Sequence, residues 1–474
     1  MVTTSKQKAW LKAIAQPATE FPLTPLSIIS GEIPSDLRGS LYRNGPGRLS
    51  RGAKRVGHWF DGDGAILGVH FTEQGATGVY RYVQTQGYLD EQSVDTYIYP
   101  NYGMKAGGAF WNNWLKPIKN AANTSVLALS DRLLALWEGG NPHALDLQDL
   151  STIGIEQLSF LTDKQPFSAH PKVDPVTGDI FNFGIGGGAN ATVNLYRCDS
   201  TGKLGQQSFH TLSGLPLIHD FCLAGEYLIF LVSPVRVNLL SVMLGQKSYS
   251  DSLQWKPELG TEILIFDRHD LALVSRGHTD PWFQWHFANG YVNQDGHIVT
   301  EFARYDDFAT NQYLKEVASG ITSTTAEGTL WSLVIDPQTA KVISNQQISA
   351  ACNEFPLVSP VKVGQEWRYT YLNVHREGVT PSQELLGAIA RFDRTTGEMA
   401  IADLGANCYP SEPILFPSKD HPEEGWILTV VFDGDSNSSE VRIYQSDRLA
   451  DEPICRLALP SVIPPGFHGT WKNQ

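Results

Sequence analysis

The stretch AIARFDRTTGEM (388–399) decides the fold class, because it joins two short apolar runs through a tight polar turn. The same form occurs in VNLYRCDSTGKL (193–204) and LWSLVIDPQTAKV (330–342), and HPKVDPVTGDI (170–180) has the same turn. An apolar run, an acidic residue, a polar turn and a second run are typical of a β-hairpin. Hairpins that recur along the chain favour a solenoid or a propeller.

Other segments extend this pattern over the whole chain. Aromatic and β-branched residues, which favour strands, are concentrated in 132–140, 226–234, 261–270, 297–305, 366–374 and 425–433. Helical periodicity is confined to residues 5–15 and a segment around 110–121. Because no linker or low-complexity tract interrupts the chain, we predict one domain over residues 1–474. Residues 1–35 are expected to form an N-terminal extension packed on it.

Composition narrows the function classes. The 474 residues are 42% hydrophobic and 18% charged, which is typical of a globular protein with a substantial core. The net charge of −14 and the lack of a dense Lys/Arg run argue against nucleic-acid binding. Five widely spaced cysteines predict free thiols in a reducing compartment. No apolar run approaches the ~20 residues of a membrane span, so we expect a cytoplasmic protein whose only membrane contact is peripheral and hydrophobic.

Four of the 13 histidines lie in apolar or aromatic surroundings: His170, His219, His286 and His468. A buried histidine needs a partner for its ring nitrogens, and a metal is one such partner. The intervals between them correspond to roughly one, one and three propeller blades, if a blade takes roughly 50 residues or somewhat more. Inner strands of different blades line one axis, so four inward histidines could meet there.

Three glutamates, Glu138, Glu354 and Glu412, lie in strand-like, poorly solvated contexts. Each could orient a metal-bound histidine, but the residues alone favour a turn cap or a pair with an arginine. Other motifs are weaker. Residues 184–189 loosely match a dinucleotide-binding loop, but a strand-like run follows, so we predict a hairpin turn. Asp61 and Asp63 in WFDGDGA resemble calcium ligands, and we interpret them as a tight acidic turn.

A set of motifs resembles the carotenoid cleavage oxygenase family over essentially the whole chain. In the order of the family, they are LYRNGPG (41–47), HWFDGDGA (58–65), LLALWEGGNPH (133–143), SAHPKVD (168–174), IHDF (218–221), H-x-x-N (286–289), EFP (354–356), SEP (411–413) and FHGTW (467–471).

The resemblance implies an all-β, seven-bladed propeller with non-haem Fe(2+) on its axis, capped by loops and a few short helices. His170, His219, His286 and His468 would be the metal ligands. Glu138, Glu354 and Glu412 would contact three of these histidines from behind, leaving His170 without a glutamate. Thr124 would lie near the open side of the iron.

The same resemblance implies a dioxygenase that uses dioxygen to cleave a polyene double bond of a carotenoid or apocarotenoid. We expect cleavage of the 15,15' bond of an apocarotenal, which would give retinal-type aldehydes. We also expect the enzyme to be a monomer. The substrate is membrane-soluble, so the tunnel mouth should contact a membrane. The candidates for this contact are Phe110, Trp111, Trp114, Leu115, Val237, Leu239, Leu240, Val242, Met243 and Leu244.

Three alternatives remain open from the sequence. The same iron site could cleave phenolic stilbenes, or it could isomerise a retinoid ester without oxygen. A propeller without metal could instead serve only as a binding protein.

Overall fold

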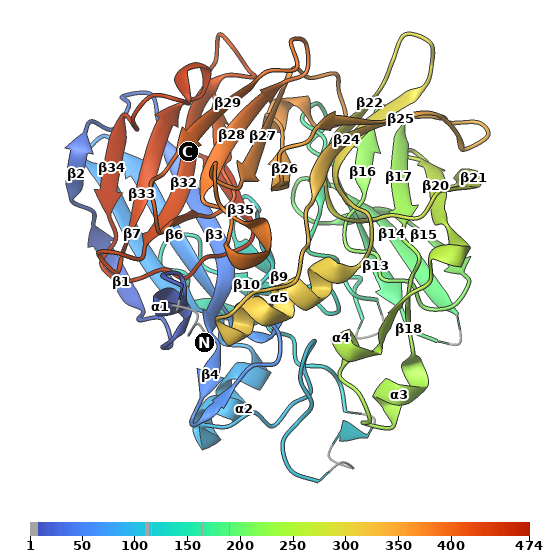
Figure 1. Ribbon diagram of the computed structural model, residues 1–474, viewed down its shortest axis with the longest axis horizontal. Coiled ribbons are helices and arrows are strands. Elements are labelled where there is room, and N and C mark those ends of the chain that lie inside the picture. Colours follow the sequence, from blue (N-terminus) through green and yellow to red (C-terminus); the bar gives the residue numbers. More distant parts are fainter. Residues whose placement is uncertain (1–7, 110–112, 115, 163–164, 189) are drawn as a thin grey trace, which may run out of the picture.

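Short antiparallel strands form most of the regular structure in the computed structural model, which describes residues 8–109, 113–114, 116–162, 165–188 and 190–474. The sheets lie around a common centre as in a propeller (Figure 1). The hairpins predicted from the sequence are confirmed. For example, β28 (Ala388–Asp393) pairs with β29 (Met399–Asp403), and β13 (Ile180–Gly186) pairs with β14 (Ala191–Cys198).

Five sheets of four to six strands are separate blades of the described structure. The first contains β1 (Phe21–Pro25), β7 (Gly75–Tyr82), β6 (Asp63–Thr72), β3 (Gly39–Arg48) and β35 (Gly469–Asn473). The second contains β11 (Thr152–Ile155), β10 (His143–Leu145), β9 (Leu133–Leu136) and β8 (Ser125–Ala128). The third contains β12 (Lys172–Val173), β13, β14 and β15 (Leu204–Leu212). The fourth contains β26 (Asn353–Leu357), β27 (Tyr369–Val374), β28 and β29. The fifth contains β2 (Ile28–Gly31), β34 (Cys455–Ala458), β33 (Ser438–Gln445), β32 (Gly425–Asp433) and β30 (Cys408–Pro410), and β31 (Ile414–Pro417) also pairs with β32.

The prediction of seven separate blades is wrong, because the remaining large sheet is continuous over eight strands. In order, they are β21 (Leu273–Thr279), β20 (Thr261–Asp267), β17 (Tyr227–Val232), β16 (Cys222–Ala224), β22 (Phe283–Val292), β23 (Ile298–Tyr305), β24 (Thr329–Asp336) and β25 (Lys341–Ser349). A parallel pairing of Ala224 with Gly290 joins its two halves. Gly290 permits this approach, since a Cβ there would lie 2.7 Å from the Cys222 sulfur. Two further small sheets pair β4 (Ser50–Arg51) with β5 (Lys54–Arg55) and β18 (Val235–Val237) with β19 (Leu253–Trp255).

The two ends of the chain close the ring of sheets. The C-terminal strand β35 pairs with β3 in the first sheet, and the N-terminal strand β2 pairs with β34 in the last large sheet of the chain. The expected N-terminal extension therefore supplies edge strands to two sheets, since β1 also pairs with β7. Residues distant in sequence are thus joined by backbone hydrogen bonds.

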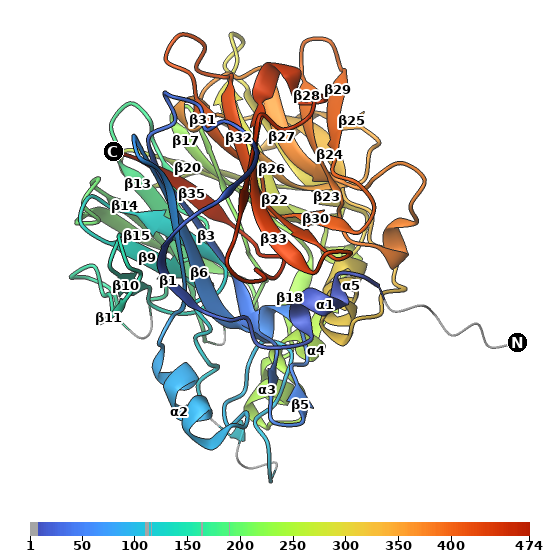
Figure 2. The same cartoon turned by 90° about the vertical axis from the view of Figure 1, so that its left-hand side faces the viewer.

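The helices are short and lie in the lower half of both views (Figures 1 and 2). They are α1 (Leu11–Ile14), α2 (Gln86–Val94), α3 (Leu239–Met243), α4 (Tyr249–Ser252) and α5 (Ala309–Ser319). Only α1 falls in a predicted helical segment. Residues 110–112 and 115 lie outside the described residues, and 116–121 form no helix. No helix among the described residues is long and apolar enough to cross a bilayer.

Candidate metal centre and cavity

Four histidine side chains from different parts of the propeller meet at one point. His286 lies within β22, while His170, His219 and His468 lie just before β12, β16 and β35. Successive Nε2 atoms are 3.0 Å apart from His170 to His219, 3.2 Å from His219 to His286 and 3.1 Å from His286 to His468. All four residues are at least nine-tenths buried.

Two of the predicted glutamates contact the outward nitrogens of these rings. Glu354 Oε2 lies 2.5 Å from His286 Nδ1, and Glu412 Oε1 lies 3.0 Å from His468 Nδ1. Because a carboxylate accepts a hydrogen bond, these contacts place the ring proton on Nδ1 and leave a lone pair on Nε2.

Glu138 is placed differently from the other two. Its Oε1 lies 3.4 Å from both His219 Nδ1 and His170 Nε2, so it contacts His219 from behind and His170 from the central side. This oxygen has no hydrogen-bond partner in the described structure. Burial raises the pKa of Glu138 well above its ordinary value, and nearby Asp220 adds to this effect. The Glu138 side chain is 31% exposed, but its Oε1 atom is buried without a partner, and a nearby cation would stabilise the ionised form of the carboxyl group.

The electrostatics of the cluster favour neutral imidazoles at His170, His219 and His468. Burial, followed by the neighbouring imidazoles, lowers the pKa values of His170 and His219 well below the ordinary range. Burial also lowers the pKa of His468, although Glu412 opposes it. For His286, burial is outweighed by Glu354 and the pKa is raised. Neutral imidazole is the form that ligates a metal.

The residues present fit a metal ion. Lone pairs that face one another at about 3 Å repel, and a cation between them converts this repulsion into attraction. The ligand atoms of the four histidines all lie within 4.8 Å of one another, a spacing that a single ion can bridge. Around them, the guanidinium of buried Arg43 lies 3.7 Å from Glu412. When ionised, the three glutamates exceed this positive charge by two, which a divalent cation offsets.

A cavity of about 510 Å³ opens directly beside the histidines. His219, His286 and His468 line it, together with Thr124, which is half-buried. Much of the remaining wall is aromatic: Trp59, Phe60, Tyr102, Trp137, Trp285, Tyr305, Tyr313, Phe355, Tyr409 and Phe467. The cavity therefore suits a long apolar molecule placed next to the metal centre.

The cavity reaches one of the segments predicted to contact a membrane. Val237 and Leu239 line it, and the adjacent Leu240 side chain is 67% exposed. Trp114 donates a hydrogen bond of 3.0 Å from Nε1 to the Leu244 carbonyl, which joins the two predicted segments. Met243 is also exposed and Val242 is half-buried. Phe110, Trp111 and Leu115 lie outside the described residues.

Sequence reasoning missed two contributors near this site. Arg43, in the LYRNGPG motif, donates to the backbone carbonyls of Glu412 and Phe467 over 2.6 and 2.7 Å. Asp220, next to His219, accepts from the Phe287 N–H over 2.9 Å and pairs with Lys172. The signal that could have found them was their position inside two of the family motifs, LYRNGPG for Arg43 and IHDF for Asp220. Their partners lie too far away in sequence for a local pattern to reveal them.

The fold and the site define an all-β propeller with a four-histidine centre beside an apolar cavity. The family model described as retinal pigment epithelial membrane protein, RPE65, matches residues 14–473. The chain is 34% identical to the apocarotenoid-15,15'-oxygenase of Synechocystis sp., covering 94% of this chain and 92% of that protein. It is 24% identical to resveratrol cleavage oxygenase 1 of Aspergillus fumigatus, covering 94% and 91%. The crystal structure of cobalt-substituted Synechocystis ACO superposes with a TM-score of 0.89, at 31% identity and 98% coverage of both chains.

These matches confirm the resemblance found in the motifs. The chain belongs to the RPE65/carotenoid cleavage oxygenase family, and it is an oxygenase of that family.

Proposed function

We propose that the protein is a non-haem Fe(2+) dioxygenase that cleaves the 15,15' double bond of an apocarotenal into two aldehydes. The observation that carries this proposal is the meeting of four Nε2 atoms at the wall of an apolar cavity. Imidazole ligands suit iron, copper and zinc. Zinc has no redox chemistry, so an oxygenase needs one of the redox-active metals, and the family resemblance favours iron. Similarity to a 15,15'-oxygenase supports the bond and the substrate class.

The chain's residues have separable roles in this proposal. His170, His219, His286 and His468 would bind the iron, which when bound supplies the activation of dioxygen. Glu354 and Glu412 orient His286 and His468 through hydrogen bonds to Nδ1. The aromatic wall binds the polyene, excludes water and places one double bond beside the metal. Thr124, in the same wall, would limit how closely the substrate approaches.

The reaction consumes one dioxygen for each double bond cleaved, because each new carbonyl carbon gains one oxygen atom. The test incubates iron-loaded enzyme with apocarotenals of graded length, an intact carotenoid and a hydroxylated stilbene, and measures oxygen uptake and aldehydes. We expect retinal-type aldehydes from apocarotenals, with equal uptake of oxygen and loss of substrate. His286→Ala should remove the activity, whereas His269→Ala, a change at an exposed histidine, should not.

Several outcomes would contradict the proposal. Cleavage of the stilbene alone would assign the site to phenolic substrates. Isomerised product without oxygen uptake would indicate a different reaction at the same centre. Tight polyene binding by iron-loaded protein with no product would make the chain a binding protein.

We further propose that α3 and its flanks contact a membrane at the cavity mouth, so that the substrate enters from the lipid. This apolar segment is continuous with the cavity, and Leu239, Leu240, Met243 and Leu244 are all exposed. Leu239→Asp with Leu240→Asp should lower binding to phosphatidylcholine vesicles in a flotation assay and leave iron content unchanged. The matched control is Ile153→Asp with Ile155→Asp, at the exposed edge strand β11. Equal binding by both double variants would exclude α3 as the contact.

A further inference from the structure

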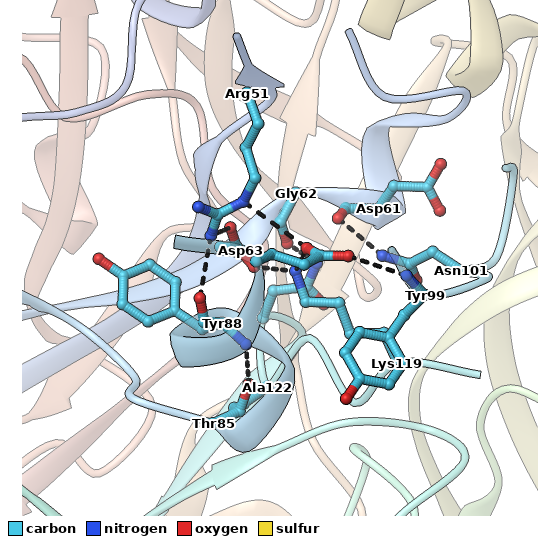
Figure 3. Close-up of polar contacts among 12 residues, drawn as sticks. Arg51, Asp61, Gly62, Asp63, Thr85, Tyr88, Tyr99, Asn101, Lys119 and Ala122 are labelled. Carbon is cyan, nitrogen blue, oxygen red and sulfur yellow. Dashed lines mark hydrogen bonds and ion pairs between the residues drawn. The ribbon is translucent and has the colours of Figure 1, made fainter. Parts of the chain in front are cut away.

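A second cluster of charged side chains lies inside the protein, outside the histidine centre. We call Arg51, Asp63, Glu91 and Lys119 the buried tetrad, and each side chain is at most 2% exposed. Figure 3 shows Arg51, Asp63 and Lys119 of this tetrad. Asp63 accepts from Arg51 over 2.6 Å and also pairs with Lys119. Glu91 accepts from Lys119 over 2.6 Å and lies 3.6 Å from Arg51. Asp63 and its partners therefore form an ion-pair network, where the sequence had suggested only an acidic turn.

The tetrad is electrically complete, since two cations face two carboxylates. Burying charges costs several kcal/mol per ion before pairing, so the network is weak evidence for a gain in stability. Its members come from four segments: β4, the start of β6, helix α2, and the irregular chain around Lys119. Glu91 also accepts from the backbone N–H groups of Ile98 and Tyr99. The tetrad thus fixes these segments relative to one another.

The segment that contains Lys119 continues directly into the cavity wall. Pro117, Ile118, Asn123 and Thr124 all line the cavity. Between them, the Gly64 N–H donates to the Ala121 carbonyl over 2.9 Å. The next contact reaches the metal centre, because the His468 N–H donates to the Thr124 carbonyl over 3.2 Å. A displacement at Lys119 would therefore move wall residues that face the substrate.

The opposite side of this cavity wall is held by residues of the HWFDGDGA motif (58–65), which also contains Asp63. Asn123 Nδ2 donates to the carbonyls of Phe60 and Gly62 over 2.9 and 2.7 Å. Asn101 Nδ2 donates to the Asp61 carbonyl over 2.9 Å (Figure 3). The Phe60 ring packs edge-on against Trp285 and Phe467, which line the cavity close to His219 and His468. Asp61 and Asp63 therefore hold in place the two segments of the chain that form one wall of the cavity.

We propose that Lys119, bound between Asp63 and Glu91, is a positioning residue that sets this wall and thereby the double bond that is cleaved. The inference rests on the proposed polyene cleavage. Successive double bonds of a polyene are chemically similar, so their choice depends on where the wall stops the substrate. A misplacement of about 1 Å can cost about a hundredfold in rate, and it would also bring a neighbouring bond to the metal.

The test uses a variant that keeps the interior neutral. Lys119→Met with Glu91→Gln removes one cation and one anion, and leaves Arg51 paired with Asp63. We expect a folded, iron-loaded protein whose kcat falls at least about tenfold and whose products include aldehydes from neighbouring double bonds. Lys119→Arg, which keeps the charge, should restore most of the wild-type product ratio. The matched control, Arg394→Met with Glu301→Gln, removes a partly buried ion pair that does not line the cavity.

A binding measurement without turnover separates positioning from catalysis. Trp59, Trp137 and Trp285 line the cavity, so a bound polyene quenches their fluorescence in metal-free protein. The Lys119 double variant should show altered quenching, and the control should match wild type. An unchanged product ratio and unchanged quenching in a folded double variant would overturn the inference, as would a loss of stability alone. If wild type cleaves no polyene, the proposed function fails instead.

Discussion

The histidine centre and the buried tetrad are both polar clusters in an apolar interior, but they differ in completeness. In the tetrad, every charge faces an opposite charge from the chain itself. At the histidine centre, lone pairs face one another and Glu138 Oε1 has no hydrogen-bond partner in the described structure. Arg51 Nε and Nη1 also lack hydrogen-bond partners in the described structure, so a missing partner alone does not distinguish the two clusters. The comparison teaches that converging lone pairs without an opposing charge mark a place where a ligand belongs, whereas a charge-balanced network marks a place where chain segments are joined.

Removing one metal-facing histidine tests the incomplete cluster most strongly. His286→Ala takes away one of four converging lone pairs and should abolish iron binding and turnover. If iron binds only the folded state, it should raise the stability of wild type, and this rise should vanish in the variant. The measurement is the melting temperature with and without Fe(2+). A variant that still gains stability from iron would show that the cluster does not need all four ligands.

Breaking the tetrad should act on stability instead of metal binding. Lys119→Met alone leaves two carboxylates facing one guanidinium and should lower the free energy of unfolding by about 3–5 kcal/mol. Urea unfolding of metal-free protein measures this loss. Adding Glu91→Gln should recover most of it by restoring neutrality. A loss below about 1 kcal/mol, the range of exposed pairs, would contradict the assignment of a fully buried network.

A smaller change at the edge of the metal centre sharpens the contrast. Glu412→Gln keeps an acceptor for His468 Nδ1 but removes the negative charge next to Arg43. Metal affinity should fall about 10–100-fold, as for other residues that orient metal ligands. Titration against a competing chelator measures the change. Glu440→Gln, at a carboxylate paired with Arg442 and Arg456 away from the cavity, should leave the affinity unaltered.

The smallest effect on stability is expected at Glu316, a carboxylate that has hydrogen-bond partners but also faces water. Burial opposes ionisation of Glu316 in α5, but hydrogen bonds from Thr324 and Ser323 outweigh it and lower its pKa to about 2. A lowered carboxyl pKa stabilises the fold above the unfolded value of 4.5, and this contribution disappears as the pH falls toward 2. The stability difference between wild type and Glu316→Gln should therefore shrink over that range. A difference independent of pH would contradict this.

Local chemistry made most of the fold predictable. An acidic residue and a polar turn between two apolar runs specify a hairpin within about a dozen residues, and β24 with β25 confirms one such prediction. The blade count failed because it depends on non-local pairing. No local pattern announces that Ala224 will pair in parallel with Gly290.

The candidate site divides in the same way into features that local sequence predicted and features that depend on distant residues. The contexts of His219 and His286 pointed to burial, and the motifs pointed to a shared centre, so their convergence was foreseeable. The position of Glu138 against two histidines was not. Nor was the role of Asp63, because its partner Lys119 lies 56 residues away. The burial of this acidic turn can be recognised only once the position of its positively charged partner, Lys119, is known.

The closing strand β35 has a consequence for synthesis. His468 immediately precedes β35, whose pairing with β3 joins the two ends of the ring. During translation, domains fold as the chain emerges, but the fourth metal ligand emerges after nearly all the other strands. A ribosome-bound or prematurely terminated chain therefore lacks a complete centre however much of its propeller has formed. The complete set of four histidines thus forms only in chains whose closing strand β35 has been made.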